Sequence, residues 1–165
     1  MTPLEPHDTR LLEAAQGWLE LGLPDEASKE LENITPELRE HPVVLRLRWG
    51  ILVAAKNWEA GLEVANSLIR LVPDDPIGWI GRSYALHEMK RTTEARENLL
   101  QVVDKFSVNS TMRYNLACYE CQLGHLEQAR GWLDKALKLG DAKAMKQAAL
   151  EDRDLEPLWG EIGQM

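Results

Sequence analysis

Three side chains with metal-binding chemistry stand out in this chain: His87, Cys118 and Cys121. Cys118 and Cys121 are three positions apart, so a helix would place both on one face. Structural zinc sites normally have four ligands, and only Glu88 or Glu120 offers itself as the fourth. We therefore expect these side chains to line a surface, with no bound metal and no other cofactor.

The sequence also lacks the usual catalytic motifs. It contains no phosphate-binding loop, dinucleotide-binding fingerprint, nucleophile elbow or His-Glu-x-x-His motif. Its many carboxylates, for instance Glu30, Glu32 and Glu37, are typical of solvated helix faces. We predict that the protein is not an enzyme. A small metal-dependent enzyme is the alternative from another functional class.

Charge is distributed unevenly along the 165 residues, which carry 19 basic and 27 acidic groups, a net of −8. Residues 1–40 have 3 basic and 10 acidic side chains, residues 41–150 have 15 and 12, and residues 151–165 have 1 and 5. Because neutralising a phosphate backbone requires clustered Lys and Arg, the acidic ends argue against a nucleic-acid partner.

Neither a membrane span nor a secretion signal is visible. The longest apolar stretch, residues 51–55, is far shorter than the roughly 20 residues of a transmembrane helix. The first residues show no basic segment followed by an apolar one. Two cysteines three apart suit reduced thiols better than a structural disulfide. We therefore expect a cytoplasmic location without membrane contact.

The strongest signal in the sequence is an internal repeat. Four small residues recur 34 positions apart, at Ala27, Gly61, Ala95 and Ala129. Apolar residues follow each of them at the fourth and seventh positions, which is the spacing of a buried helix stripe. These positions hold Leu31, Ala65, Leu99 and Leu133, and then Ile34, Leu68, Val102 and Ala136. The spacing predicts that each small residue begins the second helix of a helix hairpin.

The turns within the hairpins keep the same register. They hold Gly22, Lys56, Lys90 and Gly124, and glycine there fits a left-handed helix C-cap. The best-preserved repeat begins with Tyr114-Asn115-Leu116-Ala117 and continues to Ala129, and Trp79 follows Pro76 at the opening of the repeat before it. This pattern resembles the tetratricopeptide repeat (TPR) over roughly residues 8–141.

The resemblance implies an all-α fold, a right-handed α-solenoid of four TPR-like hairpins with a C-terminal capping helix, in one domain spanning residues 1–165. The expected repeats cover about 8–41, 42–75, 76–109 and 110–141, and the cap covers 142–165. Helices are predicted at 8–21, 24–34, 42–55, 58–72, 76–89, 92–106, 110–123 and 126–139. Within the cap, residues 155–159 are expected to fold back as a lid.

The resemblance also implies a function, because TPR proteins bind other proteins on the concave face formed by the first helices of the hairpins. On this basis we expect a scaffold or adaptor that binds an extended peptide segment of a partner. The predicted groove residues are Arg46, Ile77, Ile80, Tyr84, His87, Tyr114, Asn115 and Cys118. The same face is expected to include Thr9, Leu12, Gln16, Leu19, Val43, Gly50, Val53, Thr111 and Cys121.

Several alternatives stay open at this point. The residues of the carboxylate clamp used by chaperone adaptors are missing, because Leu12 or Ile77 stands in place of its lysines and no second asparagine joins Asn115. A secretion-type or assembly chaperone is the other binding function considered. Arg46 and Arg113 favour a neutral or acidic peptide. The partner, the oligomeric state and the use of the concave rather than another face are left undecided.

Overall fold

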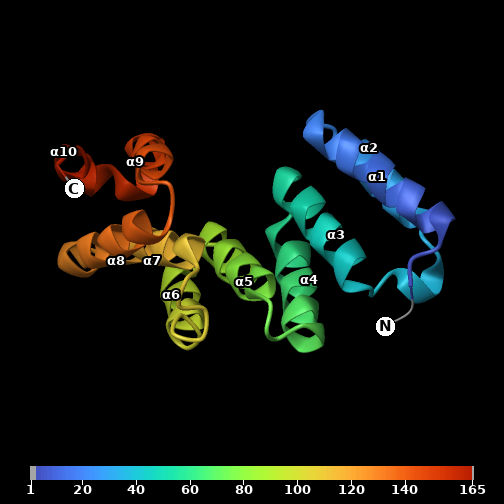
Figure 1. Ribbon diagram of the computed structural model, residues 1–165, viewed down its shortest axis with the longest axis horizontal. Helices are drawn as coiled ribbons and strands as arrows, with labels where there is room; N and C mark the ends of the chain where they lie inside the picture. Colours follow the sequence, from blue (N-terminus) through green and yellow to red (C-terminus); the bar gives the residue numbers. More distant parts are fainter. Residues whose placement is uncertain (1–2, 165) are drawn as a thin grey trace. The chain divides into compact units, whose positions relative to one another are not determined.

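The computed structural model describes residues 3–164, and every regular element in that range is helical, which confirms the all-α class. The chain forms two compact units, residues 1–85 and 86–165, each described here by itself. The first contains α1 (Pro6–Glu20), α2 (Pro24–Glu32), the short 3-10 helix η1 (Pro36–Leu38), α3 (Pro42–Ala54), α4 (Trp58–Leu71) and most of α5 (Pro76–Glu88) (Figure 1).

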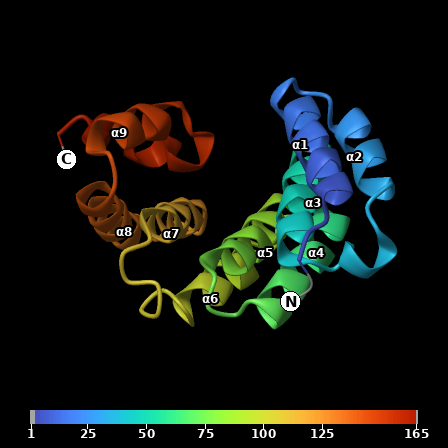
Figure 2. The same cartoon turned by 45° about the vertical axis from the view of Figure 1, so that its right-hand side comes forward.

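The second unit begins within α5 and is built on the α7–α8 hairpin. Its elements are α6 (Thr92–Leu100), α7 (Ser110–Gln122), α8 (Leu126–Leu139), α9 (Ala142–Glu151), the 3-10 helix η2 (Arg153–Leu158) and α10 (Trp159–Ile162). Helices α7 and α8 lie side by side, and α9 packs next to α8 (Figure 2).

Four equivalent turns join the helices of the hairpins. Gly22, Lys56, Lys90 and Gly124 all have positive φ, at 74°, 54°, 63° and 81°. At each turn the next residue donates its N–H to a carbonyl five positions back, for example Leu23 to Trp18 and His125 to Glu120. This is the Schellman closure of a helix C-terminus. The predicted left-handed turns are therefore present in all four hairpins.

The predicted stripe forms the core of the hairpins. The repeat residues Ala27, Ala95 and Ala129 have no exposed surface, and Gly61 is buried as well. All eight residues at the fourth and seventh positions after them are also buried. Small side chains at the start of the second helix let it approach the first helix closely. The 34-residue spacing therefore reflects a packing requirement met once in each hairpin.

Helix α6 differs from its predicted range of 92–106, because the helix ends at Leu100 and residues 101–108 form turns. The carbonyl groups of this non-helical segment need other partners. The guanidinium of Arg113 donates to two carbonyl oxygens of this segment, those of Val103 at 3.4 Å and Phe106 at 3.0 Å, and to that of the next residue, Asn109, at 2.9 Å. The segment is thus held by a side chain of the following helix.

The predicted helix over 24–34 is likewise shorter and ends at Glu32. The link to α3 contains η1 and is tied back to α1 through Asp8, a fully buried residue. The Asp8 carboxylate accepts hydrogen bonds from the backbone N–H of Thr35 at 2.8 Å and from its hydroxyl at 3.1 Å. These bonds satisfy the buried charge and fix the end of the first hairpin.

The C-terminal segment folds back on α7, as predicted for the lid. Leu155, Leu158 and Ile162 are fully buried, and η2 contacts α7, α8 and α9. The indole N–H of Trp159 donates to the carbonyl oxygens of Ala149 at 2.9 Å and Asp152 at 3.2 Å. The residues after α9 therefore form part of the core of the second unit.

Candidate functional site: a groove on the first helices of the N-terminal unit

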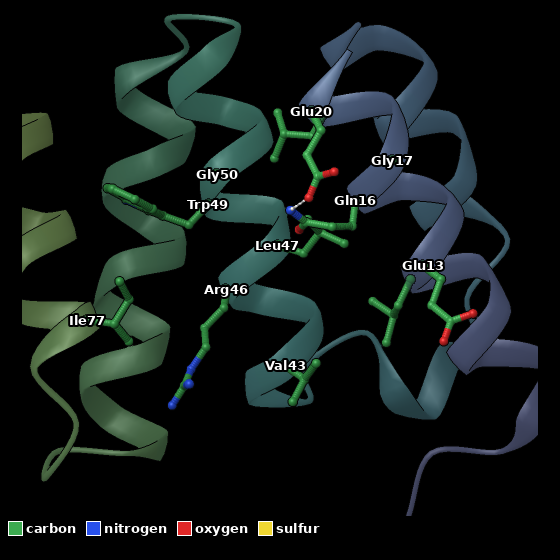
Figure 3. A pocket seen from close by; sticks show the side chains of 12 residues that line it. Glu13, Gln16, Gly17, Glu20, Val43, Arg46, Leu47, Trp49, Gly50 and Ile77 are labelled. Carbon is green, nitrogen blue, oxygen red and sulfur yellow. Dashed lines mark hydrogen bonds between the residues drawn. The ribbon is translucent and has the colours of Figure 1, made fainter. Parts of the chain in front are cut away.

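A groove with a volume of about 690 Å³ opens on the first helices of the N-terminal unit (Figure 3). Helix α1 contributes Leu12, Glu13, Gln16, Gly17, Leu19 and Glu20. Helix α3 contributes Val43, Arg46, Leu47, Trp49 and Gly50, and α5 contributes Ile77. Seven of these twelve residues belong to the face expected from the sequence, and the predicted groove residues Arg46 and Ile77 are among them.

Helical periodicity explains why these residues meet. On α3, Val43, Leu47 and Gly50 follow one another at intervals of four and three, so they lie along one face. Gly50 allows α3 to approach α1, since a β-carbon there would lie 3.3 Å from Cδ2 of Leu19. The groove is therefore bounded by two closely packed first helices.

Trp49 closes the groove toward α5. Its indole packs on the backbone of Gly81, where a β-carbon would lie 2.6 Å from Nε1 of Trp49. A larger residue at position 81 would therefore push the indole away. The Nε1–H is buried and has no hydrogen-bond partner among the described residues. The position of the Trp49 indole is therefore possible because residue 81 is a glycine, and no polar contact of the indole N–H with the described residues fixes it.

Charged side chains sit on the rim of the groove. Glu13 and Glu20 on α1 are exposed, and Glu20 accepts a hydrogen bond from Nε2 of Gln16 at 2.9 Å (Figure 3). On the other side Arg46 forms an ion pair with Asp75, whose second carboxylate oxygen accepts from the backbone N–H of Ile77. The guanidinium is thereby neutralised, whereas the two carboxylates on α1 make no ion pair within residues 3–164.

Two other predicted groove residues, Ile80 and Tyr84, lie farther along α5 and do not line this groove. Both are half-buried. The ring of Tyr84 packs edge-on against Trp58 at the start of α4, with 5.8 Å between centroids and 73° between planes. This contact holds Tyr84 against the neighbouring helix. As partner-binding residues, Ile80 and Tyr84 stay predictions.

In the second unit, three predicted groove residues contact the chain's own C-terminal segment. The hydroxyl of Tyr114 donates to Oδ2 of Asp152 at 2.9 Å, and Sγ of Cys118 lies 3.6 Å from the same oxygen. Nε2 of His87 lies 2.8 Å from Oδ2 of Asp154. The first-helix face of this unit is thus already engaged by residues 152–154.

The electrostatics of this face follow from that contact. Burial, together with the nearby acidic side chains Asp152 and Asp154, raises the pKa of the Tyr114 hydroxyl and of the Cys118 thiol. Both groups therefore stay protonated at neutral pH and act as donors to the carboxylate. The fourth predicted residue of this unit, Asn115, is half-buried. All four stay predictions as residues that bind a partner.

Comparison with known proteins identifies the architecture. No family model and no curated protein matches the sequence. Among solved structures, residues 41 to the end of MamA from Desulfovibrio magneticus RS-1 match with a TM-score of 0.72 and 17% identity, covering 98% of this chain and 94% of that one. Another MamA crystal structure matches with a TM-score of 0.70 and 15% identity, covering 85% and 82%. A MamA double mutant matches with a TM-score of 0.70 and 14% identity, covering 84% and 79%.

This chain has a TPR-type fold. In the TPR-type array the groove occupies the first-helix positions α1, α3 and α5, which is the face that the repeat register predicted. At identities of 14–17% the comparison establishes the fold and leaves the function to the residues.

The metal candidates can now be placed within the TPR-type fold. Over residues 3–164, no three or more His, Cys, Asp and Glu side chains are grouped so that they could hold a metal ion. Burial raises the pKa of the Cys121 thiol as well as that of Cys118, which opposes formation of the thiolate that binds zinc. Within the same range, no helix is long and apolar enough to cross a membrane.

Two features of the site escaped sequence reasoning. Arg113 was expected near a binding surface, but it is only 8% exposed and its guanidinium is engaged by backbone carbonyls. It therefore gives no support to an acidic ligand. Conversely, Glu13 and Glu20 were not identified, although each directly follows a residue of the predicted face, Leu12 and Leu19. Their place beside the stripe was the signal that could have found them.

Proposed function

We propose that this protein is an interaction scaffold that binds a segment of a partner protein in the groove of its N-terminal unit. The observation that carries the proposal is the groove itself, which joins apolar side chains of three first helices on one face. Val43 lines the groove and is 45% exposed, so its burial by a ligand would be favourable.

The chemistry of the groove supports binding and not catalysis. Among its twelve lining residues there is no histidine, cysteine, serine, lysine or tyrosine. The remaining charged side chains, Glu13, Glu20 and Arg46, are exposed. Such groups resemble the polar rim of a protein interface around an apolar centre. The unpaired Cys118 and Cys121 support the further proposal that the protein works in the reducing cytoplasm.

An extended segment fits this arrangement best. The lining residues of α1 and of α3 each run over two helical turns, which is a span of about 10 Å along each axis. An extended chain passes three to four side chains over that distance at about 3.3 Å per residue. A segment of this length can place some side chains on the apolar floor and others on the charged rim.

Selection of peptides that bind the immobilised full chain, followed by titration with two matched variants, tests the proposal. Val43→Asn replaces an apolar side chain of the groove by a neutral polar one. Val108→Asn makes the same change at a valine that is 80% exposed and lies outside the groove. We expect Val43→Asn to weaken binding of the selected peptides at least about tenfold, since apolar contact is lost and the amide would be desolvated in the interface, and Val108→Asn to leave it unchanged.

The outcomes of this comparison are distinct. Equal binding by the Val43→Asn variant and the unmodified protein would remove the groove from the proposed function. Circular dichroism of both variants serves as the control for folding, and Val43 is suitable because its side chain is already largely in water.

A further inference from the structure

The rim of the groove carries an unbalanced charge that indicates which peptide it accepts. Glu13 and Glu20 both line the groove and form no ion pair within residues 3–164. The single cationic lining residue, Arg46, is neutralised by Asp75. Gln16, between the two carboxylates on α1, donates a hydrogen bond to Glu20 and adds no charge. The α1 wall is therefore an acidic edge beside an apolar floor.

The spacing of the two carboxylates gives the edge a defined length. Glu13 and Glu20 are seven residues apart, two turns of α1, so they lie on the same side of the helix about 10 Å apart along its axis. In a peptide with the extended polyproline II conformation, three residues make one turn and span about 9 Å, so side chains three positions apart point the same way. Two basic side chains three positions apart would therefore reach both carboxylates at once.

The rest of the unit reinforces the sign of this field. Residues 1–40, which supply α1 and α2, carry 3 basic and 10 acidic side chains, a net of −7. These negative charges together make the local electrostatic potential more negative, which attracts a cationic ligand before contact. An acidic peptide would instead meet repulsion along the whole α1 wall.

We propose that the groove selects an extended peptide in which two basic residues, three positions apart, flank apolar residues. The basic side chains pair with Glu13 and Glu20, and the apolar residues between them cover Val43, Leu47 and Ile77 on the floor. This inference rests on the proposed function and specifies its ligand. It reverses the neutral or acidic peptide expected from the sequence, because Arg113 is buried and Arg46 is paired.

Matched peptides test the charge and the spacing separately. The probes are short peptides with the cores Lys-Leu-Val-Lys, Gln-Leu-Val-Gln and Glu-Leu-Val-Glu, and a fourth, Lys-Lys-Leu-Val, in which the lysines are adjacent. Each is titrated into the full-length protein by fluorescence anisotropy. Two partly exposed ion pairs predict about tenfold tighter binding for the spaced lysine peptide than for the glutamate peptide. The advantage should shrink at high salt, which screens exposed charges.

Charge reversal in the protein provides the second arm. The Glu13→Lys, Glu20→Lys variant should invert the order and bind the glutamate peptide more tightly than the lysine peptide. The control is Glu37→Lys, Glu40→Lys, which changes the net charge of the same unit equally at two exposed residues outside the groove. It should keep the original order, since the local pairs are intact.

Each result has one meaning. Equal affinities for the three spaced peptides, with binding still weakened in Val43→Asn, would overturn the basic-ligand inference and leave the groove function standing. The same shift in both double variants would attribute the preference to overall charge and overturn the assigned pairs. Equal binding of the peptides with adjacent and with spaced lysines would overturn the proposed spacing.

If none of the probe peptides binds, the inference is overturned. If the selected peptides fail to bind as well, the proposed function is overturned too. Loss of peptide binding through self-association, detected by sedimentation of the protein alone, would assign the groove to a second copy and also overturn the inference.

Discussion

Two of the four hairpin turns place a lysine in a conformation that favours glycine. Lys56 and Lys90 have φ values of 54° and 63°, at the positions where the other two turns have Gly22 and Gly124. A β-carbon in this left-handed region clashes with the backbone, which costs roughly 1–2 kcal/mol. Replacing either lysine by glycine should therefore stabilise the unit that contains it.

The magnitude follows from two opposing contributions. Glycine removes the left-handed strain but enlarges the conformational entropy of the unfolded chain, which costs about 0.4–1 kcal/mol. Both lysine side chains are exposed, so their removal loses little packing. We expect Lys56→Gly and Lys90→Gly each to raise the free energy of unfolding by about 0.5–1 kcal/mol, or the melting temperature of the unit by roughly 2–8 °C.

Urea unfolding followed by circular dichroism measures this effect, and alanine variants isolate its cause. Lys56→Ala removes the same lysine side chain but keeps the β-carbon, so it should bring no comparable gain. Gly22→Ala adds the β-carbon at the equivalent turn and should destabilise the first unit by about 1 kcal/mol. If Lys56→Gly proves no more stable than Lys56→Ala, the strain argument is refuted.

Two further predictions concern buried polar groups. Trp159→Phe removes two hydrogen bonds of the indole N–H, whereas the indole N–H of Trp49 has no partner among the described residues. Trp159→Phe should therefore lower the free energy of unfolding by about 1–3 kcal/mol more than Trp49→Phe does. Urea titration of both variants measures the difference, and equal losses would contradict it. The hydrogen bond from the backbone N–H of Thr35 holds the pKa of Asp8 below its usual value. The stabilisation of the fold by the ionised Asp8 is therefore present above about pH 4 and is lost as the pH falls through the lowered pKa. The stability gap between the unmodified protein and Asp8→Asn should therefore narrow on acidification in unfolding measured from pH 6 to 2, and a gap independent of pH would contradict the assignment.

The repeat could be predicted from the sequence because its cause is local. A small residue at Ala27 or Ala129 and the apolar residues after it must recur wherever one helix packs on the next. The end of α6 could not be predicted in this way. The segment after α6 is held by the buried guanidinium of Arg113, whose carbonyl partners lie up to ten residues earlier in the chain. Such a contact is decided by tertiary structure and leaves no periodic signal.

The groove was partly predictable for a related reason. The helical register placed Arg46 and Ile77 on the first-helix face that lines the groove, because their positions within the repeat assign them to that face. The register could not show that Asp75 neutralises Arg46, because that pair joins α3 to the turn before α5. Nor could it show that residues 152–154 engage Tyr114, which requires the chain to reverse after α9. Sequence periodicity therefore predicted which residues share the first-helix face. It did not predict the ion pair that neutralises Arg46 or the chain segment that contacts Tyr114.

The two units use the same repeat surface in different ways, and the difference bears on the ligand. In the second unit a segment of the chain itself lies on α7 and presents Asp152 to the Tyr114 hydroxyl and the Cys118 thiol. A first-helix face of this fold can therefore hold a non-α-helical chain segment through side-chain donors. The groove of the first unit presents carboxylates in place of donors, at Glu13 and Glu20. An acidic segment like residues 151–165, with 5 acidic and 1 basic side chains, would be repelled there. On the proposed function, we infer that the ligand complementary to the first unit is basic, unlike the acidic residues Asp152 and Asp154 that contact this face in the second unit.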